Sequence, residues 1–362
     1  MRSVRPFGER DVAEVGDLHR RVFRKAHACC HGDAASYQRY FAEVFLNRAV
    51  GGGALSSLVY ERAGRIRGFL GIMPRRMSFR GTPVLMAVCS QFVVDPSERG
   101  QAGLQLLRRC LDGPQDLSFT DEANDNTRAV WHWCGGETLL PGPLRWIRPL
   151  RPMQFALAIV ARRRSLAPLA SATMPVARIV DAIVTMTAPA RLRLSAPQGS
   201  RDALDEATFL DCLPEIAGRC ALRPEYDAPS TAWTFDRASR RTGFGGLRRL
   251  VVRNGASRVV GYFLYCLAED RTADVLQVGA RPEAVGQVLD HLFHDAMEAG
   301  ALAVRGRMDA ALVDALSERQ GLIYRDSQWT LLHSKRPDLL HAVHRGDAFL
   351  TRLEGEWCLR YP

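Results

Sequence analysis

The stretch FVVDPSERGQAG, residues 92–103, decides the fold class. It begins in a mostly apolar run, Val84–Val94, which predicts a strand buried on both faces, and Pro96 ends that strand. A glycine-containing loop follows and leads into a helix predicted from about Gly100 to Leu111. The first turn of a helix has amide N–H groups that no helical carbonyl uses, so this loop can hold a phosphate group.

Small residues in the loop let the backbone approach a ligand, and Arg99 can add a charged hydrogen bond to a phosphate. A dinucleotide site is disfavoured because the loop has neither G-x-G-x-x-G nor a Walker lysine. The alternative is a strand–helix–strand unit whose glycine turn has no ligand.

This stretch resembles the acyl-CoA-binding motif of the GNAT family of N-acetyltransferases, which has V-x-P followed by R/Q-x-x-G-x-G/A. Val94, Pro96 and residues 99–101 match that motif. Ala102 stands where glycine is usual, and Leu104 where a second small residue is usual. The resemblance implies that pantetheine binds the backbone of Phe92, Val93 and Val94. It also implies that the following loop residues hold the pyrophosphate: Arg99, Gly100, Gln101, Ala102 and Gly103.

A second stretch, NDNTRAVWHWCGG at residues 124–136, resembles a later helix of the same family, N-x-x-A-x-x-x-Y-x-x-x-G. Asn126 and Ala129 fit this pattern, which implies a cofactor contact for Asn126. Trp133 replaces the tyrosine that often protonates the leaving thiolate. Together the two motifs extend the resemblance over roughly residues 1–150.

After about residue 247 the chain repeats one order of predicted elements: hairpin, strand, helix, strand, helix, strand. We therefore expect an α/β (α+β) fold with two GNAT-like domains, each a mixed, mostly antiparallel sheet flanked by helices. The expected segments are an acyl-CoA-binding domain at residues 1–150, a helical connector at 151–235 and a diverged second domain at 236–362. In that second domain the equivalent loop, Arg281–Gly286, contains proline and glutamate, so we do not expect it to bind CoA.

In a GNAT-like reaction an amine attacks the thioester of an acyl-CoA directly. A base must take a proton from the ammonium group, and a backbone N–H stabilises the oxyanion. The family motif does not fix the base. Candidates are Asp121 and Glu122, just after a predicted strand, and His132 on the following helix, each with a structural or solvated role as the alternative.

Four further side chains have two interpretations each. Cys89 lies in an apolar run without a basic neighbour in sequence, which favours a packed thiol over an acyl-cysteine nucleophile. Ser90 either hydrogen-bonds the acceptor or pairs within its strand. Tyr226 and Trp233 either line the acceptor site or, as we favour, anchor the second domain.

Composition restricts the class of protein and its partners. The 362 residues are 47% hydrophobic and 24% charged, as in an ordinary globular protein, which excludes global disorder and a coiled coil. The net charge of +10 comes from arginines spread along the chain, so nucleic acid is not an expected partner. No Cys/His spacing resembles a zinc site, so we expect no metal.

The sequence also bears on location. No stretch of about 18 uncharged apolar residues predicts a transmembrane helix. The N-terminus lacks the apolar core of a secretory signal, and nine cysteines without a C-x-x-C pair suggest buried thiols in the cytoplasm. Arginines 162–164 and the apolar segment Met174–Met186 leave peripheral membrane contact open.

The leading hypothesis is an N-acyltransferase that moves an acyl group, with acetyl expected first, to an amine of a small molecule or sugar. Acetyl-CoA or another acyl-CoA would be the co-substrate. One alternative is a FemABX-like transferase with a tRNA-bound or carrier-protein-bound donor. A second is a catalytically silent GNAT-like binding protein, and an RNA-binding role ranks third. The sequence leaves the acyl chain, the acceptor and the oligomeric state open.

Overall fold

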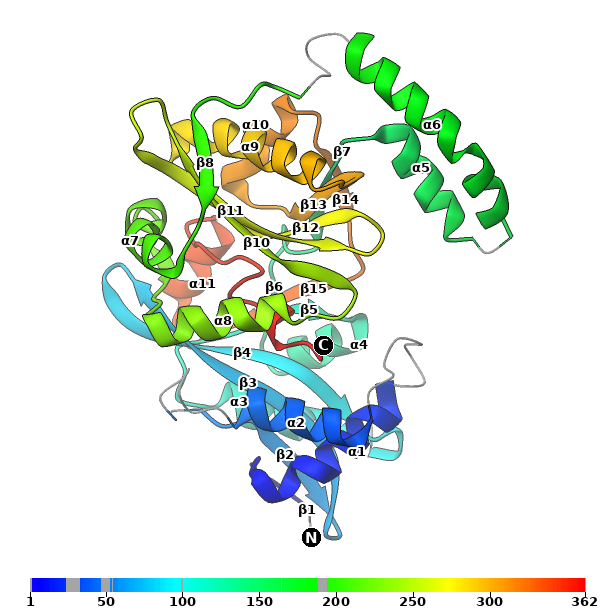
Figure 1. The fold of residues 1–362 in the computed structure, drawn as a ribbon. Coiled ribbons are helices and arrows are strands. Elements are labelled where there is room, and N and C mark those ends of the chain that lie inside the picture. Colours follow the sequence, from blue (N-terminus) through cyan, green and yellow to red (C-terminus); the bar gives the residue numbers. More distant parts are fainter. Residues whose placement is uncertain are drawn as a thin grey trace. The chain divides into compact units, whose positions relative to one another are not determined.

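The computed structural model describes residues 2–23, 33–46, 53, 55–98, 100–163, 165–187 and 194–361. The chain divides into two compact units, each built from separate parts of the sequence (Figure 1). Unit 1 contains residues 1–143, 220–237 and 327–362, and unit 2 contains residues 144–219 and 238–326. These units differ from the three consecutive segments expected from the sequence.

Unit 1 contains an eight-stranded sheet in which one pair of neighbours, β4 and β5, is parallel and the others are antiparallel. The strand order is β1 (Arg2–Pro6), β2 (Leu58–Arg62), β3 (Arg65–Phe79), β4 (Thr82–Val94), β5 (Leu117–Ala123), β15 (Trp329–His333) and β6 (Glu137–Thr138), and β9 (Leu222–Pro224) pairs with β3. The expected mixed, mostly antiparallel sheet is therefore confirmed.

Helices pack on both faces of this sheet because side chains alternate along β4. Met86 and Val88 belong to the apolar core with α1 (Val12–Phe23) and α2 (Ala34–Phe45). Ala87 and Cys89 belong to the core on the other face. That second core includes side chains of α3 (Gln101–Leu111) and α4 (Asp125–Trp133). The remaining helical segments of unit 1 are η1 (Glu9–Asp11), η2 (Pro96–Glu98), α11 (Pro337–His344), η6 (Glu356–Leu359) and most of α8 (Ala228–Ser239).

Unit 2 repeats the plan with seven strands, of which β12 and β13 are the parallel pair. The strand order is β14 (Leu322–Arg325), β7 (Leu144–Pro149), β13 (Ala303–Arg307), β12 (Thr272–Ala280), β11 (Val259–Ala268), β10 (Phe244–Arg253) and β8 (Ser200–Ala203). Its helical segments are α5 (Pro152–Ala161), α6 (Ala167–Thr187), α7 (Glu206–Ala217), η4 (Pro282–Ala284), α9 (Val285–Glu298), η5 (Ala310–Leu312) and α10 (Val313–Glu318). The helices expected in the connector are thus present, and they belong to unit 2.

Each sheet includes a strand inserted between neighbours from the distant half of the sequence. β15 lies between β5 and β6 in unit 1, and β7 lies between β13 and β14 in unit 2. The expected second domain, residues 236–362, includes Ser327–His333, whereas the structure places this strand in the sheet of unit 1. Periodicity identifies a strand but not its neighbours, and a substantial minority of strands do not pair with the next strand in sequence.

Because β7 belongs to the sheet of unit 2, the stability of unit 2 depends on a residue from the first 150 residues of the chain, Trp146. Trp146 of β7 is fully buried, its ring centroid lies 6.2 Å from that of Phe293, and Gly306 approaches it closely. Trp146→Ala should destabilise unit 2 by about 3–5 kcal/mol. Hydrogen exchange should then accelerate in β11, β12 and β13 but not in β3 and β4. Leu331→Ala in β15 should instead accelerate hydrogen exchange in β3 and β4 but not in β11, β12 and β13. Faster hydrogen exchange in unit 1 of the Trp146→Ala variant would contradict the assignment of β7 to unit 2.

Candidate functional site

The candidate site begins where β4 and β5 separate. The two strands pair in parallel at Met86–Leu117, Ala87–Ser118 and Val88–Phe119. Beyond these pairs β4 continues to Val94 and β5 to Ala123. The backbone edges that the two strands turn toward each other therefore open into a wedge, and a ligand can pair with them there.

A β-bulge changes the direction of β4 between Ser90 and Val93. The register against β3 shifts between Phe69–Val93 and Gly71–Ser90, so Gln91 and Phe92 lie opposite a single β3 residue. Gln91 has a left-handed φ of 52°. His19 of α1 lies 2.5 Å from the Gln91 side-chain oxygen, and burial lowers the pKa of His19 to about 4 although this contact raises it. The neutral imidazole therefore fixes the bulge by donating Nε2–H to Gln91.

The far end of β4 leads to the N-terminus of α3. Gly100 has a φ of 93° and is exposed, while Ala102 and Gly103 are buried. A Cβ added to Gly103 would lie 3.5 Å from the Phe92 ring, so the helix packs closely on β4 at this point. Arg99 lies outside the described residues. The first turn of α3 thus continues the edge formed by Phe92, Val93 and Val94.

Two carboxylates in this loop are paired with arginines from the neighbouring strands. Asp95 accepts a hydrogen bond from Arg67 at 3.0 Å, and Glu98 pairs with Arg62. Burial would raise the pKa of Asp95, but hydrogen bonds from Ser97 and Arg67 outweigh burial and lower it. The loop therefore keeps its acidic side chains neutralised next to the positive end of the α3 dipole.

Two residues of β4 just before the bulge point to opposite faces. The Ser90 hydroxyl is buried and has no hydrogen-bond partner among the described residues. Cys89 lies 3.6 Å, sulfur to sulfur, from Cys110, and this contact together with burial raises the pKa of Cys89 well above its usual value. Cys89 is therefore a packed, protonated thiol, as the sequence favoured.

On the β5 side the closing segment of the chain meets the end of the strand. One carboxylate oxygen of Glu356 accepts hydrogen bonds from the amides of Asp121 and Glu122, each at 3.2 Å, and from the Thr120 hydroxyl. In return, the Glu356 amide donates to Asp121 at 2.8 Å. Any Cβ at Gly355 would clash with the Asp121 carboxylate. η6 also contacts β4, so this segment lies beside both strands of the wedge.

We call Asp121, Glu122, Glu356 and Arg360 the carboxyl cluster. Arg360 pairs with Glu122, and its charge also acts on Glu356 and Asp121. Burial and the nearby charges of Glu122 and Asp121 raise the pKa of Glu356 to about 8. At neutral pH this cluster keeps a proton on Glu356 that it can exchange close to the wedge.

Comparisons with solved structures find this architecture over most of the chain. A conserved Enterococcus faecalis protein of unknown function, described as a "probable N-acyltransferase", has a TM-score of 0.60 and 11% identity. The match covers 92% of this chain and 73% of that one. A GCN5-related N-acetyltransferase from Anabaena variabilis gives a TM-score of 0.57, 13% identity and coverages of 93% and 74%. A GCN5-related N-acetyltransferase from Kribbella flavida gives a TM-score of 0.51 and 15% identity, and the match covers 92% of this chain and 72% of that one.

This chain has the GNAT fold. Both of its mixed sheets fit a tandem GNAT arrangement, as the sequence resemblance implied. The comparison with protein-family models found no match, and the search of curated proteins found none either. At identities of 11–15% the structural matches establish the fold.

Within this GNAT fold the two acidic candidates lie together. Asp121 is buried beneath Gly355, and Glu122 is half-buried against Arg360. His132 is instead exposed on α4, with Nε2 2.8 Å from the Thr138 hydroxyl. Asn126 is exposed in the first turn of α4. Glu356 is not among the residues predicted from the sequence, although a glutamate beside a glycine in a mostly apolar closing segment was a signal for it.

Tyr226 and Trp233 both belong to unit 1. The Tyr226 hydroxyl donates to the buried Glu354 at 2.8 Å, and Arg75 lies over the Trp233 ring, 5.6 Å from its centroid. Within unit 1 these contacts hold α8 and the closing segment. Whether the two side chains line the acceptor site or anchor the second domain, as we favour, stays a prediction.

In unit 2 the helix that corresponds to α3 is α9, and its N-terminus differs from that of α3. The segment just before α9 contains Pro282, which has no N–H, and a Cβ at Gly286 would clash with Arg319. Arg319 in turn pairs with Asp290 of α9 at 2.8 Å. Absence of CoA binding by unit 2 stays a prediction. Among the described residues no group of three or more acidic, His or Cys side chains is arranged to hold a metal ion.

The raised pKa of Glu356 predicts a pH-dependent stability. The folded state holds its proton up to about pH 8, whereas the unfolded state loses it near pH 4.5, so this contribution to stability is lost as pH rises through that window. Glu356→Gln keeps a neutral hydrogen-bonding group. The Tm of this variant relative to wild type should therefore rise between about pH 5 and about pH 8 and then level off.

Thermal unfolding followed by circular dichroism measures this difference. Glu9→Gln, at an exposed position of unit 1, is the matched control and should show no such trend. A constant Tm difference for Glu356→Gln across the pH range would contradict the proposed protonation of Glu356.

Proposed function

We propose that the chain is an N-acyltransferase that transfers an acyl group, acetyl in the simplest case, from acyl-CoA to an amine of a small molecule or sugar. The observation that carries the proposal is the wedge between β4 and β5, which runs from the carboxyl cluster to the N-terminus of α3. It offers strand backbone for an extended chain and a helix end for an anion. Acyl-CoA has both features, a pantetheine arm and a pyrophosphate.

In this proposal the pantetheine arm pairs with the backbone edge of Phe92, Val93 and Val94. The pyrophosphate accepts hydrogen bonds from the backbone amides at the α3 N-terminus. Arg99 adds a positive charge there, and Asn126 makes a further contact. The residues whose backbone forms that end are Gly100, Gln101, Ala102 and Gly103. A backbone N–H at the bulge stabilises the oxyanion that forms on the thioester carbonyl.

In this proposal the carboxyl cluster accepts the proton that the acceptor ammonium group loses. The amine nitrogen forms a bond to the acyl carbon, the C–S bond breaks, and CoA leaves as a thiolate. The ammonium proton passes to a carboxylate of the cluster, either Glu122 or Asp121 acting with Glu356, directly or through water. His132 is the remaining candidate base, from the exposed face of α4. Trp133 is 80% exposed and has no acidic proton, so it does not protonate the thiolate.

The α3 end of the site can be tested by calorimetric titration with acetyl-CoA. Gly100→Glu places a negative charge at the α3 N-terminus, where a Cβ meets nothing within 4 Å, and should weaken binding at least tenfold. Gly100→Ala carries the same backbone strain without the charge and should bind more tightly than the glutamate variant. Gly243→Glu, at an equally open glycine of unit 2 with positive φ, should bind like wild type. Equal binding by all variants would contradict the assignment of the loop.

The catalytic assignment can be tested by following thiol release from acetyl-CoA with a panel of amines. Glu356→Gln and Glu122→Gln should each lower kcat by about 10²–10⁴ while leaving acetyl-CoA affinity unchanged. Binding of acetyl-CoA without transfer to any amine would favour a silent binding protein. Absence of both binding and transfer would favour a donor bound to tRNA or a carrier protein.

A further inference from the structure

α5 and α6 form a helical hairpin in unit 2 (Figure 1). Asp181 of α6 fixes the pairing, because its carboxylate accepts hydrogen bonds from the amides of Met153 at 2.9 Å and Gln154 at 3.0 Å at the start of α5. Ala170 and Ala177 are buried on the same side of α6 as Asp181. The hairpin is therefore a built element with one defined inner face.

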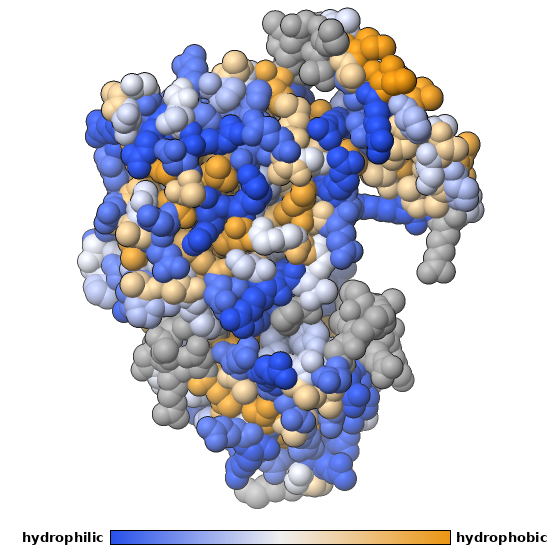
Figure 2. All heavy atoms as spheres, viewed as in Figure 1, coloured by the Kyte–Doolittle hydropathy of each residue, from blue (hydrophilic) through white to orange (hydrophobic). Residues whose placement is uncertain are grey.

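The opposite face of α6 is apolar and exposed. Leu169, Val176, Ile179 and Ile183 recur at spacings of three, four and seven residues, and their exposed fractions are 62%, 61%, 62% and 53%. We call them the apolar stripe. Figure 2 shows hydrophobic atoms gathered along this helix. A contiguous apolar surface of this kind marks a site of contact with a protein or a membrane.

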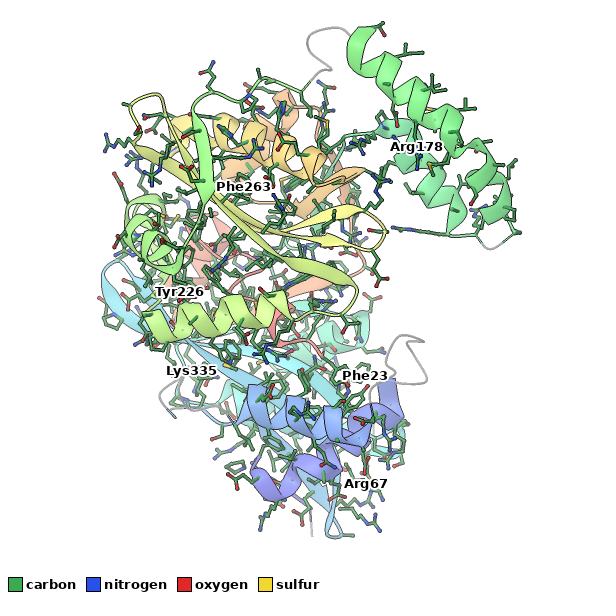
Figure 3. All side chains as sticks on the ribbon, in the orientation of Figure 1. Phe23, Arg67, Arg178, Tyr226, Phe263 and Lys335 are labelled. Carbon is green, nitrogen blue, oxygen red and sulfur yellow. The ribbon has the colours of Figure 1, made fainter. Side chains whose placement is uncertain are left out.

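Beside the hairpin lies a cavity of about 620 Å³, which we call the arginine pocket. Its lining includes Arg151, Arg178, Arg271, Leu150 and Met297. Figure 3 labels Arg178, which projects from α6. The carboxylate among the lining residues is Asp181, and it is already bonded to the α5 amides.

The positive charge in the pocket is only partly compensated. Arg271 donates to the Gly300 carbonyl at 2.9 and 2.7 Å, and Arg151 donates to the Met297 carbonyl at 3.4 Å. These carbonyls, just after α9 and at its end, carry partial charges. Burial and the charges of Arg151 and Arg178 lower the pKa of Arg271. Three guanidinium groups that line one pocket fit a phosphate, which can accept the N–H groups that these carbonyls do not use.

The charge of the whole hairpin identifies the partner. Residues 151–187 contain five arginines and one aspartate, a formal charge of 5 − 1 = +4. Two copies of this surface would therefore repel each other. A soluble phosphate would fill the pocket but leave the stripe uncovered. An anionic lipid surface matches both features, because it offers phosphates and acyl chains together.

We propose that the α5–α6 hairpin binds the surface of an anionic phospholipid membrane, with a lipid phosphate in the arginine pocket and the apolar stripe among the outermost acyl chains. Arg163, exposed after α5, adds to the attraction, whereas Arg162 pairs with Asp270 at 2.6 Å. This is a peripheral contact, since no helix among the described residues is long and apolar enough to cross a bilayer. The inference does not depend on acyl transfer.

Co-sedimentation with vesicles tests the proposal, with phosphatidylcholine alone compared with phosphatidylcholine mixed with phosphatidylglycerol. Wild type should sediment with the mixed vesicles only. Arg178→Glu changes two charges, each worth about 1 kcal/mol near an anionic surface, and should weaken binding about thirtyfold. Val176→Gln, Ile179→Gln and Ile183→Gln combined should weaken it at least tenfold without unfolding, because these side chains are exposed.

The matched control is Arg219→Glu, the same charge change just after α7, away from the hairpin and the pocket, which should bind within about threefold of wild type. Equal losses in Arg178→Glu and Arg219→Glu, or binding to phosphatidylcholine alone, would overturn the proposal. So would saturable binding of glycerol phosphate without vesicle binding, which would indicate a soluble ligand. A dimer in sedimentation velocity that the stripe variant abolishes would overturn it in favour of a second copy of the chain.

Discussion

The separation of β4 from β5 after the Val88–Phe119 pair is the constraint on which unit 1 depends. Strand edges that lose their partner inside a protein need other hydrogen-bond partners. On the β5 side the Glu356 carboxylate supplies them, since it accepts the amides of Asp121 and Glu122. On the β4 side the bulge at Gln91 turns the strand toward the start of α3. The closing segment thus stabilises one edge, and in our proposal the ligand pairs with the other.

The same arrangement explains why the carboxyl cluster holds an unusual proton. Glu356 reaches the β5 amides only by entering a buried space that Asp121 and Glu122 already share. Arg360 offsets part of the negative charge but not all of it, so the pKa of Glu356 stays raised, at about 8. A structural requirement, the satisfaction of two strand amides, therefore produces a titratable group beside the wedge.

Local patterns in the sequence predicted most elements of unit 1 but not their assembly. The apolar run ending at Val94, the glycine turn and the helix after it are where we expected them. Strand exchange was not predictable from the sequence. The patterns of β15 and β7 are those of ordinary strands, and tertiary contacts determine which strands they pair with. Asp121 and Glu122 were found because they end a strand, whereas Glu356 comes from the opposite end of the chain, more than 230 residues away. His132 looked similar in sequence, yet it lies exposed on α4.

The central claim is that the edge of β4 beyond its last pair with β5, together with the first turn of α3, binds an acyl-CoA. Amide hydrogen exchange with and without acetyl-CoA tests it most directly, because it reports on individual segments. The account predicts protection of residues 91–94 and 101–104, with no change at the corresponding start of α9, residues 282–288. Protection confined to unit 2, or none at residues 91–104 under saturating acetyl-CoA, would contradict it.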